Sequence, residues 1–363
     1  MSNATPATEN TSEHTRTSDN TFTYREPVTS VDGWTKEQLL GLADPDPEME
    51  LMLAKTDPAM LDVGQHYYRL VRDLMAKAKL ANPPTPPPAG MFERNITIPT
   101  HDGSSISIRV YRSDSPPAKQ CPLYVNFHGG GFVLGDLDSD AYLCRMLVHE
   151  LGVVVVDVDY RLAPEWPFPT PVWDCFDALL WLSKHHIEIG ADPAKGFVVA
   201  GTSAGGNLAA VCSHLARDEK MNPPLTGVHL IIPSICGREV MPEKYKSRLL
   251  SVDQLVDNPV LSVKALRNFR QHYAVEFGSP LYNVINWPTG HEGLPPHWVQ
   301  VCGADMLRDE ALIYEQCLRE EGNVESRLRV YPGLPHGFWA VWPEMVGSKG
   351  FMEGIMEGAR WLL

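Results

Sequence analysis

Gly201-Thr202-Ser203-Ala204-Gly205-Gly206-Asn207 is the stretch that decides the fold of this chain. It follows an apolar run, residues 197–200, and it leads directly into the apolar residues 208–211. This order predicts a buried strand, a sharp turn that carries Ser203, and a helix, which is the setting of a nucleophile elbow. Glycines on both sides let neighbouring backbones approach where a Cβ would clash. The Ser203 hydroxyl is then expected above the sheet, with the Ala204 amide at the positive end of the helix.

The same residues have a simpler interpretation, a Gly/Ser loop that closes an ordinary βα unit, and the motif alone leaves both open. A second segment, residues 128–132 with the sequence HGGGF, follows the strand-like residues 123–127. Consecutive glycines after a strand can turn their amides toward one point, so Gly130 and Gly131, together with Ala204, are the expected oxyanion donors. A phosphate-binding loop is disfavoured, because neither segment has the Lys-Ser/Thr of a P-loop or the spacing G-x-G-x-x-G.

The acid of a catalytic triad is expected at a strand end. Asp305 follows the apolar residues 297–302 after Gly303 and Ala304, at a strand end where a carboxylate faces the same crevice as other strand-end residues. Asp309 is the alternative acid. It and Glu310 fall in the predicted first turn of a helix, where carboxylates stabilise the positive helix end. Strand-end position and chain order favour Asp305.

Two histidines are candidates for the base. His128 precedes the glycine segment, a place that favours a side chain bracing the loop by hydrogen bonds. His336 lies in a Pro-Gly-rich turn after the strand-like residues 327–331 and is the first histidine after Asp305. The order Ser203, Asp305, His336 is that of α/β-hydrolases and differs from the orders of other serine-protease folds.

Together these segments resemble the hormone-sensitive-lipase-like family of α/β-hydrolases, the HGGG esterases, from about Phe92 to the C-terminus. The matching stretches are residues 128–132, 159–165 (DYRLAPE), 201–207, 305–310 and 336–338. The resemblance implies an α/β-hydrolase fold with a mostly parallel eight-stranded sheet, helices on both faces and a helical cap. Thr202, where many members have Asp, and Met306, where Pro is common, depart from the family pattern without removing a reacting group.

The resemblance also implies roles for individual residues. Ser203, Asp305 and His336 would form the triad, while Gly130, Gly131 and Ala204 would form the oxyanion hole. Asp159, Arg161 and Glu165 of the DYRLAPE block would be polar supports of the scaffold. Phe132 and Leu134, beside the oxyanion segment, are expected in the substrate pocket, although packing alone explains them equally well.

The function implied is a serine carboxyl-ester hydrolase that acts through an acyl-enzyme on small to medium acyl esters or lactones, with neither metal nor cofactor. One alternative is acyl transfer, lactonisation or elimination with the same triad, because one fold supports many chemistries. The other is a non-catalytic small-molecule receptor, which the presence of all three triad residues disfavours.

Composition limits the partners. The 363 residues include 31 Lys and Arg against 45 Asp and Glu, a formal net charge of −14, which argues against nucleic acid and anionic membranes as partners. The seven cysteines include no CxxC pair, so no disulfide framework or zinc site is expected. Without an apolar N-terminal segment or a stretch of ~20 apolar residues, a cytoplasmic protein with no membrane insertion is expected. The sequence allows a homodimer.

Four parts are expected along the chain. Residues 1–30 are polar and predict a disordered tail, and residues 31–90 predict N-terminal cap helices followed by a Pro-rich linker. Residues 91–236 and 286–363 predict the catalytic domain, in which near-continuous apolar strands alternating with helices indicate a parallel sheet covered on both faces. Residues 237–285 interrupt that alternation and predict a cap insertion.

Overall fold

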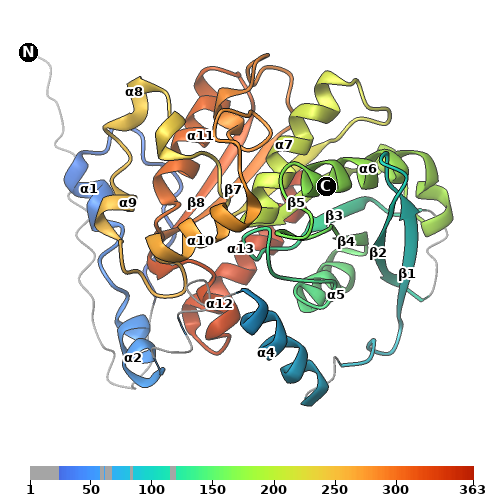
Figure 1. Ribbon diagram of the computed structural model, residues 1–363, viewed down its shortest axis with the longest axis horizontal. Coiled ribbons are helices and arrows are strands. Elements are labelled where there is room, and N and C mark those ends of the chain that lie inside the picture. Colours follow the sequence, from blue (N-terminus) through green and yellow to red (C-terminus); the bar gives the residue numbers. More distant parts are fainter. Residues whose placement is uncertain (1–23, 58–60, 62–67, 82–84, 115–119) are drawn as a thin grey trace, which may run out of the picture.

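A single sheet organises the chain in the computed structural model, which describes residues 24–57, 61, 68–81, 85–114 and 120–363 (Figure 1). Its eight strands run in the order β1-β2-β4-β3-β5-β6-β7-β8. They are β1 Met91–Pro99, β2 Ser105–Ser113, β3 Leu123–Phe127, β4 Val154–Asp159, β5 Phe197–Thr202, β6 Gly227–Ile231, β7 His297–Ala304 and β8 Ser326–Pro335. The β1–β2 and β2–β4 pairs are antiparallel and the other five pairs are parallel, so the predicted mostly parallel, eight-stranded sheet is confirmed.

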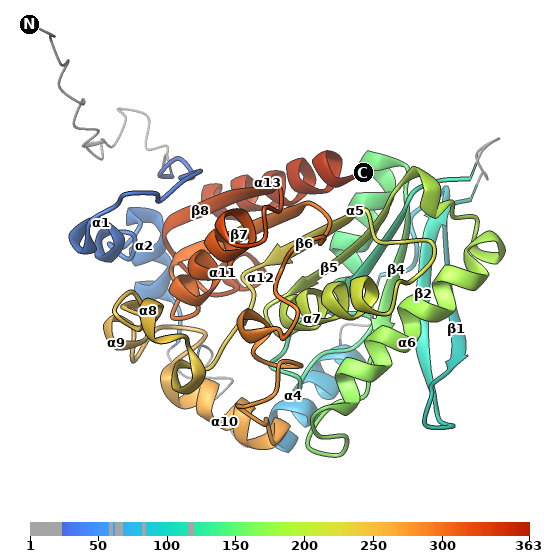
Figure 2. The same cartoon turned by 90° about the horizontal axis from the view of Figure 1, so that it is seen from above.

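Helices cover both faces of this sheet (Figure 2). The α-helices of the described part are α1 Lys36–Gly41, α2 Pro47–Lys55, α4 Tyr68–Ala81, α5 Ala141–Leu151, α6 Thr170–His185, α7 Ala204–Asp218, α8 Glu243–Lys246, α9 Ser251–Gln254, α10 Val263–Tyr273, α11 Arg308–Glu320, α12 Phe338–Val341 and α13 Val346–Leu362. Strand side chains alternate between two cores: Val199 packs on the side of α6, α7 and α11, whereas Val198 and Ala200 pack on the side of α5 and α13. Burial on both faces is why the central strands are rich in apolar residues on both sides.

The N-terminal part joins the sheet earlier than predicted. Residues 1–23 lie outside the described residues, but Val28 exchanges two backbone hydrogen bonds of 2.8 Å with Val330 of the edge strand β8. The ring of Tyr24 packs against Gly350 of α13. The boundary predicted at residue 30 is therefore too late, because the free edge of β8 offers hydrogen bonds that a polar segment can take.

Residues 237–285 and the helix α4 lie at the carboxyl ends of the strands. In residues 237–285 the described elements are helical, and Ser262 caps α10 by accepting a hydrogen bond from the Ala265 amide at 3.1 Å. Among the helices expected in residues 31–90, α4 is present from Tyr68, while residues 62–67 lie outside the described part. The rings of Tyr68 and His272, 4.8 Å apart between centroids, join α4 to α10. In the described part of the chain, no helix has the length and apolar character needed to cross a bilayer.

Candidate active site

The turn between β5 and α7 holds Ser203 in a strained backbone conformation. Its φ of 56° and ψ of −111° lie in a region that residues with a Cβ rarely adopt. A Cβ on Gly201 would lie 2.1 Å from the carbonyl oxygen of Gly205, and a Cβ on Gly205 would lie 1.9 Å from that of Phe127. Both flanking glycines are therefore sterically required, as the elbow interpretation of the sequence expected.

Three distant turns bring Ser203, Asp305 and His336 together. His336 Nε2 lies 2.9 Å from Ser203 Oγ, and His336 Nδ1 lies 2.6 Å from Asp305 Oδ2. Asp305 is 1 % exposed, and its other oxygen accepts a hydrogen bond from the Leu307 amide at 2.9 Å. Asp305 follows β7 and His336 follows β8, so parallel strand ends place acid and base at one edge of the sheet.

The HGGG loop lies beside the elbow. Gly130 and Gly131 have φ values of 115° and 62°, and a Cβ on Gly131 would lie 2.5 Å from the Phe269 ring. Among the residues described, neither glycine donates its amide to another backbone group. Ala204 opens α7, where the first amides of a helix have no acceptor within it. These three residues line one cavity with Ser203 and His336.

That cavity measures about 370 Å³ and is mostly apolar. Phe132 and Leu134 line it, and the Phe132 ring stacks on Tyr273 at 3.9 Å between centroids. Much of the remaining wall comes from α4, α10 and α12 and from residues that flank α10, and most of these residues were not named from the sequence: Met75, Leu261, Leu266, Phe269, Arg270, Tyr282, Trp339 and Val341. The cap expected in residues 31–90 and 237–285 hinted at this contribution, but not at the side chains that line the cavity, because contacts between distant segments leave no local signal.

His128 braces the HGGG loop. Its Nδ1 lies 2.7 Å from the Gly129 carbonyl oxygen, its ring stacks on Tyr160, and the Tyr160 hydroxyl donates to the His128 carbonyl at 2.8 Å. The ring is fully buried and has no contact with Ser203 among its hydrogen bonds. This geometry matches the bracing interpretation and not the role of a base.

Asp309, the alternative acid, is engaged elsewhere. Its Oδ2 accepts hydrogen bonds of 2.6 Å from the amides of Leu250 and Ser251, and its Oδ1 pairs with Arg308 Nε at 2.7 Å. The carboxylate therefore ties the start of α11 to residues 250–251. Asp305 alone of the two contacts His336.

Glu310 is buried in the same first turn of α11, where its Oε1 accepts from the Ile235 amide at 2.7 Å. Burial raises the pKa of this carboxyl from 4.5 to about 7, against the opposing effects of Arg270 and the amide donors. The protonated form contributes stability below pH 4.5, and this contribution is lost as pH rises through 7.

We therefore expect the unfolding free energy of the wild type, relative to Glu310→Gln, to fall by on the order of 3 kcal/mol between pH 4.5 and pH 8. Chemical denaturation of both proteins across this range measures the difference. Glu325→Gln, which changes an exposed carboxyl, is the matched control. Parallel stability curves for the wild type and Glu310→Gln would contradict the assignment.

The sequence pattern of a family described as alpha/beta hydrolase fold matches residues 124–340, which contain the elbow, the HGGG loop and the triad. The chain belongs to this α/β-hydrolase family, in its hormone-sensitive-lipase-like branch. An AB hydrolase superfamily protein of Schizosaccharomyces pombe is 37% identical over 318 residues, which cover 88% of this chain and 94% of that protein. Versiconal hemiacetal acetate esterase of Dothistroma septosporum is 31% identical over 81% of this chain and 88% of its own.

Solved α/β-hydrolases share the whole architecture. Vibralactone cyclase superposes with a TM-score of 0.79 at 33% identity and covers 93% of this chain and 98% of its own. A bacterial heroin esterase superposes with a TM-score of 0.74 at 31% identity, covering 88% and 98%. The predicted fold class and family are therefore confirmed.

Proposed function

We propose that this chain is a serine carboxylesterase that cleaves small to medium acyl esters or lactones through an acyl-enzyme. The observation that carries the proposal is the hydrogen-bonded series Asp305–His336–Ser203 beside the glycine loop, inside one cavity. Relatives that are esterases support the same activity, including the carboxylesterase NlhH of Mycobacterium tuberculosis. Acyl transfer, lactonisation, elimination and a receptor role are not favoured by these relatives.

In the acylation step, Ser203 Oγ attacks the ester carbonyl carbon while His336 Nε2 takes the hydroxyl proton. His336 Nδ1 donates to Asp305, whose negative charge stabilises the imidazolium that forms. The tetrahedral oxyanion accepts hydrogen bonds from the amides of Gly130, Gly131 and Ala204, each worth ~3 kcal/mol in such sites.

The intermediate collapses when His336 Nε2 gives its proton to the leaving alcohol oxygen, which leaves the acyl group on Ser203. Water then loses a proton to His336 and attacks the acyl carbonyl, and the second intermediate releases the carboxylic acid as Ser203 Oγ regains the proton. Each residue of the triad thus returns to its starting state, and the reaction consumes only ester and water.

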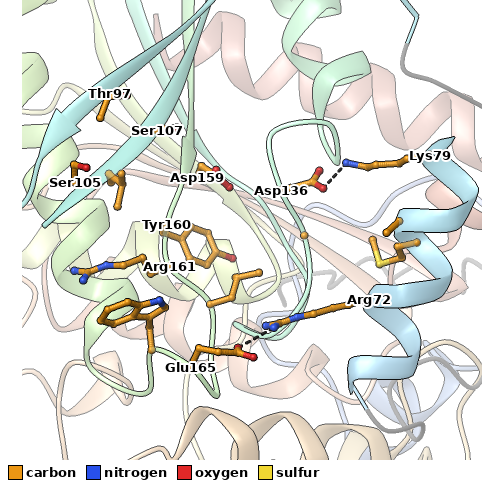
Figure 3. Close-up of a pocket in the computed structure, with 16 residues that line it drawn as sticks. Arg72, Lys79, Thr97, Ser105, Ser107, Asp136, Asp159, Tyr160, Arg161 and Glu165 are labelled. Atoms are coloured by element: carbon orange, nitrogen blue, oxygen red, sulfur yellow. Dashed lines mark hydrogen bonds and ion pairs between the residues drawn. The ribbon is translucent and has the colours of Figure 1, made fainter.

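Residues 31–90 and 237–285 are proposed as the two parts of a cap. Met75 of α4 and Phe269 of α10 line the cavity with Ser203, which supports this assignment. Figure 3 shows how α4 is fixed to the body: Arg72 reaches Glu165, and Lys79 reaches Asp136.

Arg72 is the most connected residue of this attachment. Its Nη2 donates to the carbonyl oxygens of Val133 and Ala163, both at 2.7 Å, and its Nη1 pairs with Glu165 Oε2 at 2.8 Å. One guanidinium thus joins α4 to the loop that follows the HGGG segment and to the loop that follows β4.

Replacing Arg72 with alanine is expected to raise KM for aryl esters about tenfold, because α4 and Met75 lose their fixed position over the cavity. Steady-state kinetics measures KM, and hydrogen exchange reports whether α4 loosens. Lys77→Ala, an exposed change on the same helix, is the control. An unchanged KM with a loosened α4 would remove α4 from the proposed cap.

The proposed activity is tested with aryl esters of graded acyl length, supplied to the purified chain and to its Ser203→Ala variant. Hydrolysis by the wild type, with a preference for short or medium acyl groups, is the expected result. Absence of hydrolysis across the whole series would refute the proposal.

A cytoplasmic location is also proposed. All seven cysteines are free, and six of them are buried as small core side chains, which suits a reducing compartment. A homodimer stays a prediction.

A further inference from the structure

Arg270 is the single arginine or lysine among the described residues that line the cavity of Ser203. It lies on α10, near the end of the helix, and its Nε donates to the Tyr282 hydroxyl at 2.9 Å. Around it the cavity wall is largely apolar, with Leu266 and Phe269 on the same helix. A cation in such surroundings is costly to bury unless an anion compensates it.

Arg270 is held in a fixed position relative to the nucleophile. Tyr282, which accepts its Nε–H, is itself bound through its carbonyl oxygen to Asn207 Nδ2 at 2.7 Å. Asn207 lies in the first turn of α7, and its amide donates to the Ser203 carbonyl at 3.1 Å. These side-chain and backbone contacts connect Arg270 to the elbow through two buried residues, Tyr282 and Asn207, so the position of the guanidinium does not depend on an exposed loop.

The protein does not neutralise this charge by direct contact. Within the described part of the chain, Nη1 and Nη2 of Arg270 make neither a hydrogen bond nor an ion pair. Glu310 and Glu239 act on Arg270 only through longer-range attraction. Burial raises the pKa of Glu310 to about 7, so its negative charge is incomplete at neutral pH.

We propose that Arg270 is a carboxylate-binding subsite of this cavity, and that the preferred substrates are esters or lactones that carry a carboxylate group apart from the ester that is cleaved. The two free Nη atoms form a planar fork that matches the two oxygens of a carboxylate. Tyr282 accepts a hydrogen bond from Nε alone, so it leaves Nη1 and Nη2 available to a ligand. The predicted substrate preference rests on the proposed esterase activity, whereas the predicted binding of a carboxylate at Arg270 does not.

The specificity that follows is a difference between matched substrates. A ligand without an acceptor at this place leaves Nη1 and Nη2 of Arg270 unpaired in an apolar cavity, whereas a carboxylate supplies both acceptors and the opposite charge. Binding of a carboxylate would also order the substrate, because its far end is fixed while the ester lies at Ser203.

Two pairs of esters test the subsite: the first carries the additional carboxylate on the acyl group and the second carries it on the leaving group. In the first pair, the 4-nitrophenyl ester of adipic acid is compared with the same ester in which the free carboxylate is a carboxamide. In the second pair, the butyryl ester of 3-hydroxybenzoate is compared with that of 3-hydroxybenzamide. The quantity measured is the carboxylate-to-carboxamide ratio of kcat/KM, for the wild type, Arg270→Gln and Arg267→Gln, which removes an exposed charge from the same helix.

In at least one pair, Arg270→Gln is expected to lower this ratio roughly ten- to a hundredfold, whereas Arg267→Gln leaves it within about twofold. An equal ratio in the wild type and Arg270→Gln for both pairs would overturn the proposal. If Arg270→Gln does not fold, the wild type decides: preference for the carboxamide in both pairs overturns the subsite, and preference for a carboxylate supports it.

Binding separates this proposal from the proposed activity. Calorimetry with hexanoate as the probe needs no turnover, so it applies even if the wild type hydrolyses none of the four esters. Hexanoate binding to the wild type that weakens at least tenfold in Arg270→Gln, and not in Arg267→Gln, supports the subsite. Failure of hexanoate to bind the wild type, or equal binding by Arg270→Gln, overturns it.

Discussion

Ser203→Ala is expected to lower kcat for aryl esters by ~10⁴- to 10⁶-fold, because no other group can form the acyl-enzyme. Ser203 Oγ is the only atom of its residue that the variant removes, and it is the atom that His336 Nε2 contacts at 2.9 Å. Any remaining hydrolysis would come from oxyanion stabilisation and substrate binding alone. Initial rates with a short-chain aryl ester measure the loss.

The fold should survive this change. Alanine keeps the Cβ at the same strained φ of 56°, and the backbone hydrogen bond from the Ser203 amide to Ile231 does not involve the hydroxyl. We expect the unfolding free energy to change by less than ~1 kcal/mol. A fluorophosphonate probe should label the wild type and not the variant. Substantial esterase activity in well-folded Ser203→Ala would remove Ser203 from the mechanism.

Gly205→Ala has the largest expected effect on stability. Its Cβ would lie 1.9 Å from the carbonyl oxygen of Phe127 and 2.6 Å from that of His128. Both atoms belong to backbone at the end of β3, so α7 and the HGGG loop must separate to admit the methyl group. We expect destabilisation of about 3 kcal/mol or more, together with loss of activity as Ala204 moves away from Gly130 and Gly131.

Chemical denaturation measures the first effect, and ester hydrolysis by the remaining folded fraction measures the second. Gly278→Ala is the matched control, because Gly278 is exposed and a Cβ there would meet nothing within 4 Å. A Gly205→Ala protein as stable as the control would mean that the elbow and the HGGG loop are less tightly packed than their geometry indicates.

The elbow, the strands and the order of the proposed triad could be predicted from the sequence, because each requires particular residue types at particular positions. Gly201 and Gly205 flank Ser203 because other backbone atoms lie so close to both glycines that a Cβ would clash with them. Since only glycine meets this requirement, it can be recognised in the sequence. The carboxyl ends of parallel strands lie at the same edge of a sheet. Asp305 and His336 each follow a predicted parallel strand, so both could be placed at that edge from the sequence alone. The pairing of Val28 with β8 could not be predicted from residue types, since any extended segment can pair with a free strand edge.

The sequence by itself determined which residues are proposed as reacting groups, because a nucleophile, its base and its acid require particular residue types at particular strand ends. Only the tertiary structure decided what surrounds them. In the sequence nothing distinguishes Arg270 from other arginines of predicted helices. Only the tertiary structure shows that it lines the cavity of Ser203, where contacts through Tyr282 and Asn207 connect it to the elbow. Arg72 likewise holds α4 through carbonyl oxygens of Val133 and Ala163, and any residue type could have supplied those acceptors. Contacts of this kind depend on backbone position rather than on side-chain identity, so they arise only when distant segments pack together.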